Sequence, residues 1–375
     1  MNTRSTIQTS AARRKVRYAV VGLGHIAQVA VLPAFAHARR NSRLTTIVSG
    51  DPEKLAQVGD KYRVPVRGTY DELDACLRNV DAVYIATPNT EHADIAVRAA
   101  HAGVHVLCEK PLSTTDADCA RIISACREAG VRIMTAYRLH FEPITVEVLE
   151  LVRSGRIGEP RYFTSEFSMI AKPDNIRTRP ETGGGTLYDL GVYCVNAARM
   201  VFDAEPNQVF AYSIDGARSG FPDVDETTAA MLRFNGDRLA TFVTSFGAAD
   251  ASSYRIVGTE GDIRVDPAYE YAEALGYQLT IGGHTTRKRG KRVDQFAAEL
   301  LYFSDCVLED REPEPSADEG AWDLRIIDAL YESSRTGEPI SLRPFEGDPG
   351  PSRDQAMHQP PVRKPETVNV DTPHE

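Results

Sequence analysis

The feature that most constrains the fold is a glycine-rich loop between a short apolar segment and a helical pattern. The valine-rich segment 16–21 runs directly into Gly22-Leu23-Gly24-His25-Ile26-Ala27. Gly22 suits a tight turn at the end of a strand, and Ala27 allows the next helix to pack closely on that strand. Gly24 lets backbone amides at a helix N-terminus approach a phosphate group. The loop therefore predicts the first strand-helix unit of a dinucleotide-binding sheet, with cofactor contacts from Gly22, Gly24, His25 and Ile26.

Short apolar runs separated by helical stretches continue to about residue 137. This alternation is typical of a parallel sheet with crossover helices. Asp51-Pro52 has the composition of a helix start, and Gly103 and Gly130 stand where helices end before strands. We expect an α/β Rossmann domain over residues 16–137, with strands near residues 16–21, 44–49, 66–68, 82–86, 104–108 and 133–136.

The pattern changes after residue 142. A helical stretch to about residue 153 is followed by strand-like segments near residues 161–169, 208–213, 227–234, 239–245, 254–258 and 261–265. Consecutive strands joined by short turns such as Asn235-Gly236-Asp237 favour antiparallel pairing. We expect an α+β domain over residues 138–345, built on a mostly antiparallel open sheet and closed by helices near 293–308 and 318–334. Residues 1–15 and 346–375 are expected to form a flexible arm and a disordered tail.

The overall charge argues against a nucleic-acid partner. The chain carries 53 acidic against 43 basic residues, a net charge of −10, which repels a phosphate backbone. The basic run 287–292 contains no aromatic residues that could stack on bases. We interpret this run as a solvated loop between a strand and a helix.

Cysteine usage and the N-terminus predict a cytoplasmic protein. The six cysteines show no Cys-x-x-Cys pair and no Cys/His ligand spacing, so we expect reduced thiols and no metal site. Arg13-Arg14-Lys15 precedes an apolar run, as in an export signal. That run is needed as the first strand, however, and no small-residue cleavage site follows it. No membrane partner is expected.

The end of the second strand bears on which dinucleotide binds. Sites for NAD usually place a carboxylate there to bind the ribose diol, whereas sites for NADP leave room for a 2′-phosphate. This chain has Ser49-Gly50-Asp51, with Lys54 one helical turn further on. A serine in place of the acid, followed by Gly50 and Lys54, favours NADP. Asp51 keeps NAD possible, because its side chain either caps the next helix or reaches the ribose.

Two further segments follow strands at the same edge of the predicted sheet. Ligands of open α/β sheets bind at the carboxyl ends of the strands. Thr87, Pro88, Asn89 and His92 follow the fourth strand, and we expect them to line the cofactor, although His92 alternatively caps its helix. Glu109-Lys110-Pro111 ends the fifth strand, and both Glu109 and Lys110 are expected at the cofactor.

With these motifs the chain resembles a known family. Glu109-Lys110-Pro111, the glycine loop ending in alanine and the downstream segment 184–193 are similar to the Gfo/Idh/MocA oxidoreductases. The resemblance spans about residues 16–343 and is greatest to the glucose–fructose oxidoreductase-like members, through residues 49–54, 137–143 and 189–193. It implies hydride transfer between a nicotinamide ring and a carbinol or carbonyl carbon of a sugar or cyclic polyol.

The resemblance implies that Lys110, Asp189 and Tyr193 are the catalytic residues. A cationic amine beside the cofactor stabilises a developing alkoxide, and we expect partial burial to lower the pKa of Lys110. Asp189 and Tyr193 are four residues apart, so in a helix they project from one face. Many family members carry histidine where this chain has Tyr193. Either Tyr193 or Lys110 is therefore left to move the proton.

Four further polar residues are expected to bind the sugar. Arg138 and His140 follow the sixth strand near the domain junction, and Arg138 is also expected at the cofactor. Arg177 and Arg179 precede the glycine run 183–185. The predicted substrate set is therefore Lys110, Arg138, His140, Arg177, Arg179, Asp189 and Tyr193.

Two other functions remain open at this stage. One is a non-catalytic NADP-binding regulatory protein of the same fold, against which the presence of Lys110, Asp189 and Tyr193 argues. The other is a glycosidase that uses bound NAD transiently, which would release sugar without net cofactor reduction. The open face of the second sheet, rich in aromatic and β-branched residues, predicts a homodimer or homotetramer.

Overall fold

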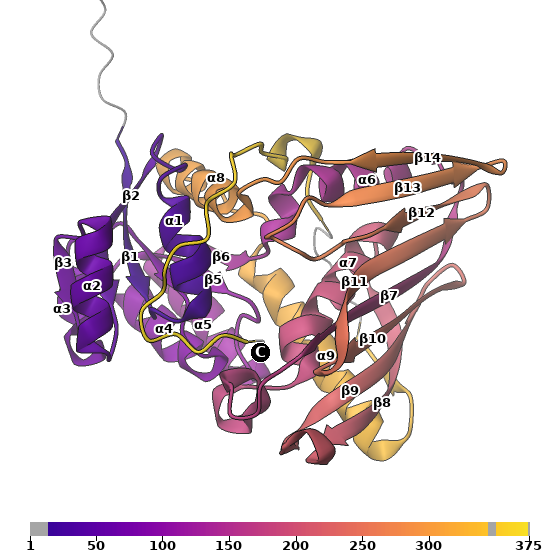
Figure 1. Cartoon of the computed structure of the whole chain (residues 1–375), viewed down its shortest axis with the longest axis horizontal. Coiled ribbons are helices and arrows are strands. Elements are labelled where there is room, and N and C mark those ends of the chain that lie inside the picture. The colour runs from indigo at the N-terminus through magenta and orange to yellow at the C-terminus, as the bar shows by residue number, and fades with distance from the viewer. Residues whose placement is uncertain (1–13, 344–349, 374–375) are drawn as a thin grey trace, which may run out of the picture.

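The first part of the chain forms a six-stranded sheet. The computed structural model describes residues 14–343 and 350–373, and the strand order in this sheet is β3-β2-β1-β4-β5-β6 (Figure 1). All neighbouring strands are parallel, which confirms the predicted Rossmann fold. From β1 the chain first adds β2 and β3 on one side of the sheet, and then adds β4, β5 and β6 on the other side. Ligands of such sheets bind at the point between β1 and β4 where the order reverses. The strands are β1 (Val16–Val21), β2 (Ser42–Val48), β3 (Val66–Gly68), β4 (Ala82–Ile85), β5 (His105–Glu109) and β6 (Ile133–Ala136).

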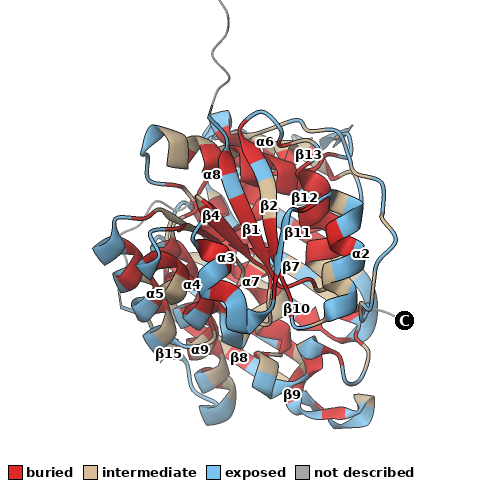
Figure 2. Ribbon diagram, turned by 90° about the vertical axis from the view of Figure 1, so that its left-hand side faces the viewer, coloured by how far each residue is buried: buried red, intermediate tan, exposed pale blue. Residues whose placement is uncertain are grey.

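Helices cover both faces of this sheet, which explains why its strands are apolar along their length. Every residue of β4 is buried, and Figure 2 shows β1 and β4 as a buried central layer. The glycine loop leads into a π-helical turn, Ala27–Val31, that continues into the short helix α1. The helices of this domain are α1 (Leu32–Ala34), α2 (Pro52–Tyr62), α3 (Leu73–Leu77), α4 (His92–His101) and α5 (Asp116–Ala129).

The second sheet has nine strands in the order β14-β13-β12-β11-β7-β10-β9-β8-β15. Its neighbours pair antiparallel except β7 and β10, which run parallel, so the sheet is mixed and mostly antiparallel as expected. The strands are β7 (Pro160–Ile170), β8 (Pro206–Gly216), β9 (Phe221–Phe234), β10 (Arg238–Ser245), β11 (Gly247–Gly258), β12 (Gly261–Val265), β13 (Gly276–Ile281), β14 (His284–Arg289) and β15 (Ile340–Ser341).

The hairpin β13-β14 corrects one prediction. Arg287, Lys288 and Arg289 belong to the fully exposed strand β14, whereas we expected a loop over residues 287–292. Arginine and lysine on an exposed outer strand discourage pairing with a further strand. The polar sequence concealed the strand because neither of its faces is buried.

One face of the second sheet is covered by helices and the other is open. The helices α6 (Pro143–Arg153), α7 (Val192–Phe202) and α9 (Ala317–Thr336) lie between this sheet and the first domain (Figure 1). Their apolar side chains share one core with the sheet, including Val148, Ala198 and Ile327. The strands alternate accordingly, with Ala240 and Phe242 of β10 buried toward the helices and Leu239 and Val243 exposed on the other face.

Two late helices revise the predicted domain boundary at residues 138–345. Helix α8 (Gln295–Glu309) packs Phe296, Leu300 and Phe303 into the core that contains β1 and α1 of the first domain. Helix α9 contributes Leu324 to the first domain and Leu330 to the second. Hydrophobic periodicity identifies the apolar face of a helix but not the sheet which that face will cover.

The predicted disorder of residues 346–375 is contradicted for the part that the structure describes. Residues 350–373 follow an extended path from the second domain over the first (yellow in Figure 1). The buried Gln355 donates to the backbone oxygen of Glu314 at 2.9 Å, and the amide of Met357 donates to the Phe141 oxygen at 3.1 Å. Hydrogen bonds to distant residues hold a segment of low apolar content. Residues 346–349, 374–375 and most of the predicted arm (1–13) lie outside the described residues.

Among the residues that the structure describes, no helix is both long enough and apolar enough to cross a membrane.

Candidate active site

The glycine loop has the shape that a pyrophosphate requires. Gly22 has a φ of 92°, and a Cβ there would lie 2.6 Å from the Ala86 carbonyl oxygen, so β1 and β4 approach too closely for a side chain. A Cβ on Gly24 would meet no atom within 4 Å, which leaves its surroundings open to a ligand. The buried Thr87 Oγ1, which follows β4, has no hydrogen-bond partner among the described residues. An open loop and an unpaired hydroxyl at one sheet edge fit a bound dinucleotide.

The residues after β2 are arranged around the start of α2. Asp51 caps this helix, since its Oδ1 accepts from the amides of Glu53 at 2.8 Å and Lys54 at 3.1 Å. The buried Ser49 accepts a hydrogen bond from the Asp51 amide at 3.2 Å, and Gly50 lies against the ring of Tyr70. Asp51 therefore takes the capping role that the sequence left open, and its Oδ2 remains for other partners.

The segment after β4 is bonded to the loop after β5 and to the second domain. The buried His92 has Nδ1 at 3.0 Å from the Pro111 oxygen and Nε2 at 3.1 Å from the Thr87 oxygen. Both ring nitrogens of His92 therefore face backbone carbonyls of the loops after β4 and β5, and its place at the cofactor stays a prediction. The side-chain Nδ2 of Asn89, the residue after Pro88, donates to the Gly183 backbone oxygen at 2.9 Å and joins this loop to the second domain.

Lys110 lies where the two domains meet, in contact with both other predicted catalytic residues. Its Nζ donates to the Asp189 backbone oxygen at 2.8 Å and to Asp189 Oδ1 at 3.1 Å. The same nitrogen lies 4.7 Å from the centre of the Tyr193 ring. Asp189 lies in the middle of a π-helical turn, Leu187–Gly191, that leads into α7, which begins just before Tyr193. The four-residue spacing thus brings Asp189 and Tyr193 to one face, toward Lys110.

The charges around Lys110 correct its expected pKa. Burial by itself would lower the pKa of Lys110, but Tyr193, Asp189 and Glu109 outweigh burial and raise the pKa above its usual value. Burial likewise opposes ionisation of Asp189, but Arg177 and Lys110 hold the pKa of Asp189 well below its usual range. Arg177 Nε donates to Asp189 Oδ2 at 2.7 Å. Lys110, Asp189 and Arg177 therefore form a charged row at neutral pH.

Arg138 connects Tyr193 to Tyr269 and to helix α8. The guanidinium of this buried residue donates to Tyr193 Oη at 3.1 Å and to the Tyr269 oxygen at 2.6 Å, and it contacts Gln295 of α8 at 2.5 Å. The Arg138 guanidinium also lies 4.9 Å from the centre of the Tyr193 ring and 5.4 Å from that of Tyr271. Sequence reasoning missed Tyr269, Tyr271 and Gln295, because no local motif marks them.

A buried carboxyl pair lies beside Lys110. Tyr84 of β4 donates to Glu109 Oε1 at 2.7 Å and lies 3.4 Å from Glu299 Oε2 on α8. Burial raises the pKa of both Glu109 and Glu299. Sequence reasoning placed Glu109 at the cofactor but missed Glu299, since only the packing of α8 brings it near β5.

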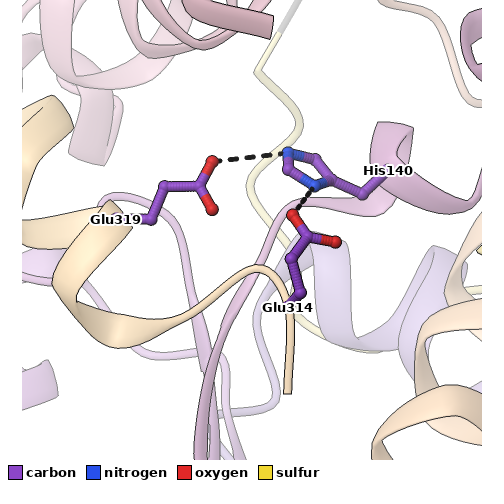
Figure 3. A group of neighbouring side chains, drawn as sticks. All are labelled: His140, Glu314 and Glu319. Carbon is purple, nitrogen blue, oxygen red and sulfur yellow. Dashed lines mark hydrogen bonds and ion pairs between the residues drawn. The ribbon is translucent and has the colours of Figure 1, made fainter. Parts of the chain in front are cut away.

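His140 is not part of this site, contrary to prediction. Its side chain is fully buried, with Nδ1 at 2.7 Å from Glu314 Oε1 and Nε2 at 3.0 Å from Asn196 Oδ1 (Figure 3). Glu319 Oε1 lies 3.8 Å from Nε2. The two carboxylates face opposite nitrogens of one ring, which is the geometry of an ion pair with a protonated histidine (Figure 3).

Arg179 also lies apart from the catalytic residues. Its half-exposed side chain comes within 4.0 Å of Asp174 on the surface, while Arg177, two residues earlier, reaches Asp189. The irregular segment around these residues lets neighbouring arginines point in different directions. No regular periodicity in the sequence could have distinguished them.

Comparison with protein families places this geometry in a known group. Residues 16–137 match the model of an oxidoreductase family with an NAD-binding Rossmann fold, and residues 145–264 match the GFO/IDH/MocA C-terminal domain. The chain belongs to the GFO/IDH/MocA oxidoreductase family. The resemblance stated from the motifs is thereby confirmed, as is the expectation of an oxidoreductase.

The relatives include enzymes that act on sugars. D-xylose 1-dehydrogenase [NADP(+)] of Haloarcula marismortui is 33% identical over 345 residues, which cover 89% of this chain and 95% of that enzyme. The crystal structure of aldose-aldose oxidoreductase from Caulobacter crescentus, complexed with glycerol, has a TM-score of 0.84 and 36% identity, over 88% of this chain and all of that one. A 3-ketoreductase from Actinomadura kijaniata, in complex with NADP and TDP-benzene, has a TM-score of 0.78 and 27% identity, over 85% and 98% of the two chains.

Proposed function

We propose that this protein is an NADP-dependent oxidoreductase that interconverts a C–OH group and a C=O group of an aldose or similar polyol. The observation that carries the proposal is the contact of Lys110 Nζ with both Asp189 and Tyr193, at the edge where the family binds its dinucleotide. The sugar-oxidising activities named for relatives at 33% and 36% identity support the substrate class. A regulatory protein would not need this arrangement of charges.

The choice of NADP rests on the residues after β2. Ser49 stands where an NAD site usually has an acid, and Asp51 is engaged as a helix cap. Lys54 lies in the first turn of the same helix and supplies a positive charge for a 2′-phosphate. Relatives named or solved with NADP agree with this choice.

In the proposed mechanism the bound dinucleotide supplies the hydride acceptor, and the protein handles the proton. Tyr193, as the phenolate, takes the proton of the substrate hydroxyl as the carbonyl forms, and as the phenol it returns the proton in the reverse direction. Lys110 and Arg138 are cations beside Tyr193, and they stabilise negative charge on its phenol oxygen and on the substrate oxygen. Lys110 does not act as the base, because its raised pKa keeps it protonated at neutral pH.

The remaining polar residues orient the substrate and the catalytic cation. Asp189, held between Arg177 and Lys110, fixes the direction in which the Lys110 amine points. Arg177 and Arg138 offer guanidinium donors to sugar hydroxyls, since the contacts described above use only some of the five N–H groups of each arginine.

The direct test is a cofactor and substrate panel. Purified protein is mixed with NADP or NAD and with D-xylose, other aldoses and inositols, and absorbance at the reduced-nicotinamide band is followed. We expect cofactor reduction with NADP and at least one aldose. Cofactor binding without turnover on any substrate would support the regulatory alternative. Sugar release from glycosides without net cofactor reduction would support the glycosidase alternative.

We also propose a homo-oligomer formed through the open face of the second sheet. Apolar side chains of neighbouring strands lie in register there, since Tyr212 and Val243 both oppose Ala229 of β9. Six residues on this face are large, apolar and at least two-fifths exposed: Tyr162, Tyr212, Ile214, Met231, Leu239 and Val243. A second copy of the chain would remove this apolar surface from water.

A cytoplasmic location is part of the proposal. All six cysteines are buried and none forms a disulfide, which suits a reducing compartment. Fractionation of expressing cells with antibody detection would test the location.

A further inference from the structure

Residues 366–373, which we call the clasp, cross the ligand-binding edge of the first domain. Lys61 of α2 donates from Nζ to the Glu366 backbone oxygen at 2.7 Å. Both backbone groups of Val368 pair with the side chain of Gln28, the amide at 2.8 Å and the oxygen at 2.9 Å. Gln28 follows the glycine loop and also donates to the Leu23 oxygen at 2.9 Å. The clasp is therefore tied directly to the residues that shape the pyrophosphate loop.

The clasp next reaches the end of β2, which contacts the adenosine ribose in dinucleotide-binding folds of this type. Asn369 donates from Nδ2 to Asp51 Oδ2 at 3.1 Å and to Glu53 Oε2 at 2.9 Å. The backbone amide of Asp51 donates to Ser49, at the position that distinguishes the two dinucleotides in this fold. One asparagine thus spans the first turn of α2 from outside.

The far end of the clasp is fastened to the second domain. Asn175 donates to Asp371 Oδ2 at 2.9 Å, and Lys172 Nζ donates to Thr372 Oγ1 at 3.1 Å. The Lys172 amide lies 3.4 Å from the Pro373 oxygen. The segment that contains Lys172 and Asn175 leads to Arg177, which donates to Asp189. The clasp therefore connects the end of β2 with the segment next to the proposed catalytic residues (Figure 1).

The clasp is built to open without unfolding the protein. Its described residues belong to no helix or strand, and their hydrogen bonds lie at exposed or half-buried positions. Val368 packs on the core and Pro373 is buried, while the other described residues of the clasp are exposed or half-buried. The chain before it is anchored independently, because the Asp294 amide donates to the Gln359 oxygen at 3.0 Å. Segments with few buried contacts open locally at low free-energy cost.

We propose that residues 366–373 close over the adenosine-ribose end of the bound dinucleotide and slow its release, so that the protein retains its cofactor. The inference rests on the dinucleotide binding proposed above. Release then requires the contacts to Gln28, Asp51 and Asn175 to break together, which acts on the dissociation rate. A segment that merely occupied the site would slow association instead.

The test measures both rates with NADPH. Bound NADPH, monitored by its fluorescence, is chased with excess NADP in stopped flow, and association is followed separately by mixing. The proteins are the full chain, a truncation that ends at Pro365, the single variants Asn369→Ala and Asp371→Ala, and the matched control Glu366→Ala. Only the backbone oxygen of Glu366 is engaged among the described residues, so its variant keeps the contact.

We expect the truncation to raise the dissociation rate about tenfold or more, and each single variant to raise it about two- to fivefold, with Glu366→Ala unchanged. Truncated protein should also lose NADPH on a desalting column that the full chain survives. Equal NADPH dissociation rates in all the proteins, or a truncation that accelerates only NADPH association, would contradict the proposed role of the clasp. Failure of the full chain to bind NADPH or NADH at all would overturn the proposed function together with the clasp.

Discussion

At the scale of single residues, the decisive property is the charge of Lys110. From sequence, an amine beside a cofactor is expected to have a lowered pKa, because desolvation disfavours the cation. The structure adds Asp189 at 3.1 Å and the Tyr193 ring at 4.7 Å, and these partners reverse the direction of the shift. In the proposed mechanism Lys110 is therefore an electrostatic stabiliser, and Tyr193 carries the proton.

Replacing Lys110 with methionine tests the cation. Methionine keeps much of the side-chain volume but removes the charge, so kcat should fall about 100-fold or more while NADPH binding changes little. The control is Lys288→Met, which should leave kcat unchanged, since Lys288 of the far strand β14 pairs with Glu147 of α6. Activity of Lys110→Met equal to that of the parent would refute the role of this lysine.

Replacing Tyr193 with phenylalanine tests the proton carrier. Loss of one oxygen removes the acceptor of Arg138 and the proposed proton path, so kcat should fall about 100-fold with a small change in KM for NADP. Tyr188→Phe is the matched control, because the Tyr188 hydroxyl donates to Asp328 and not to the site. Equal losses in the two variants would show a structural effect rather than proton transfer.

At the scale of elements, the segment after β6 is held by an ion pair instead of offering a ligand to the sugar. His140 connects this segment to Glu314 and to Glu319 of α9 (Figure 3). Burial by itself would lower the pKa of His140, but the two carboxylates raise it to about 9. Sequence placed His140 correctly after a strand, yet only the packing of α9 decided what it faces.

This ion pair predicts a pH dependence of stability. A histidine whose pKa is raised on folding stabilises the protein fully below its unfolded pKa of about 6.5, and the contribution is lost as pH rises through about 9. The free energy of unfolding should therefore fall between pH 7 and pH 10, on the order of 2 kcal/mol from this residue. Urea unfolding of the parent and of His140→Gln would measure it.

The informative quantity is the difference between those two curves, because other buried groups titrate in both proteins. Glu319, whose pKa burial raises to about 7, shifts stability in the same direction at lower pH. A parent and a His140→Gln variant with parallel pH profiles from pH 7 to pH 10 would contradict the assignment.

At the scale of the whole molecule, the two domains are fastened by more than their junction. Helix α8 returns to cover the first sheet, α9 contributes to both cores, and residues 350–373 cross back over the first domain. The proposed catalytic residues Lys110, Asp189 and Tyr193 lie where the two domains meet. The open sheet face stays on the outside of this assembly and is free for another copy of the chain (Figure 1).

A charge on that face should dissociate the proposed oligomer. Val243→Asp together with Met231→Asp places two carboxylates on neighbouring strands of the apolar surface, which desolvation on association would penalise. Sedimentation analysis should show a dimer or tetramer for the parent and a monomer for this variant. Val66→Asp, at an equally exposed valine of β3 in the other domain, is the control. A monomeric parent would refute the interface.

Local chemistry in the sequence determined the first domain almost completely. Tight-turn glycines, helix caps and apolar strand lengths act within a few residues, so β1, β3 and β6 have the predicted bounds. The family motifs could be recognised for the same reason, because each is a short continuous segment. The four-residue spacing of Asp189 and Tyr193 was likewise enough to place them on one face. The exposed strand β14 was not predicted, because none of its residues is buried and its sequence therefore lacks alternating apolar positions.

Only the tertiary structure decided what depends on distant residues. The sheet that α8 covers, the path of residues 350–373, the burial of His140 and the charge of Lys110 all follow from contacts between segments far apart in the chain. Burial and electrostatic energies depend on separation in space, and a sequence records separation along the chain. The sequence therefore determined the glycine loop proposed to bind the dinucleotide, and the fold decided the charges of the proposed catalytic residues.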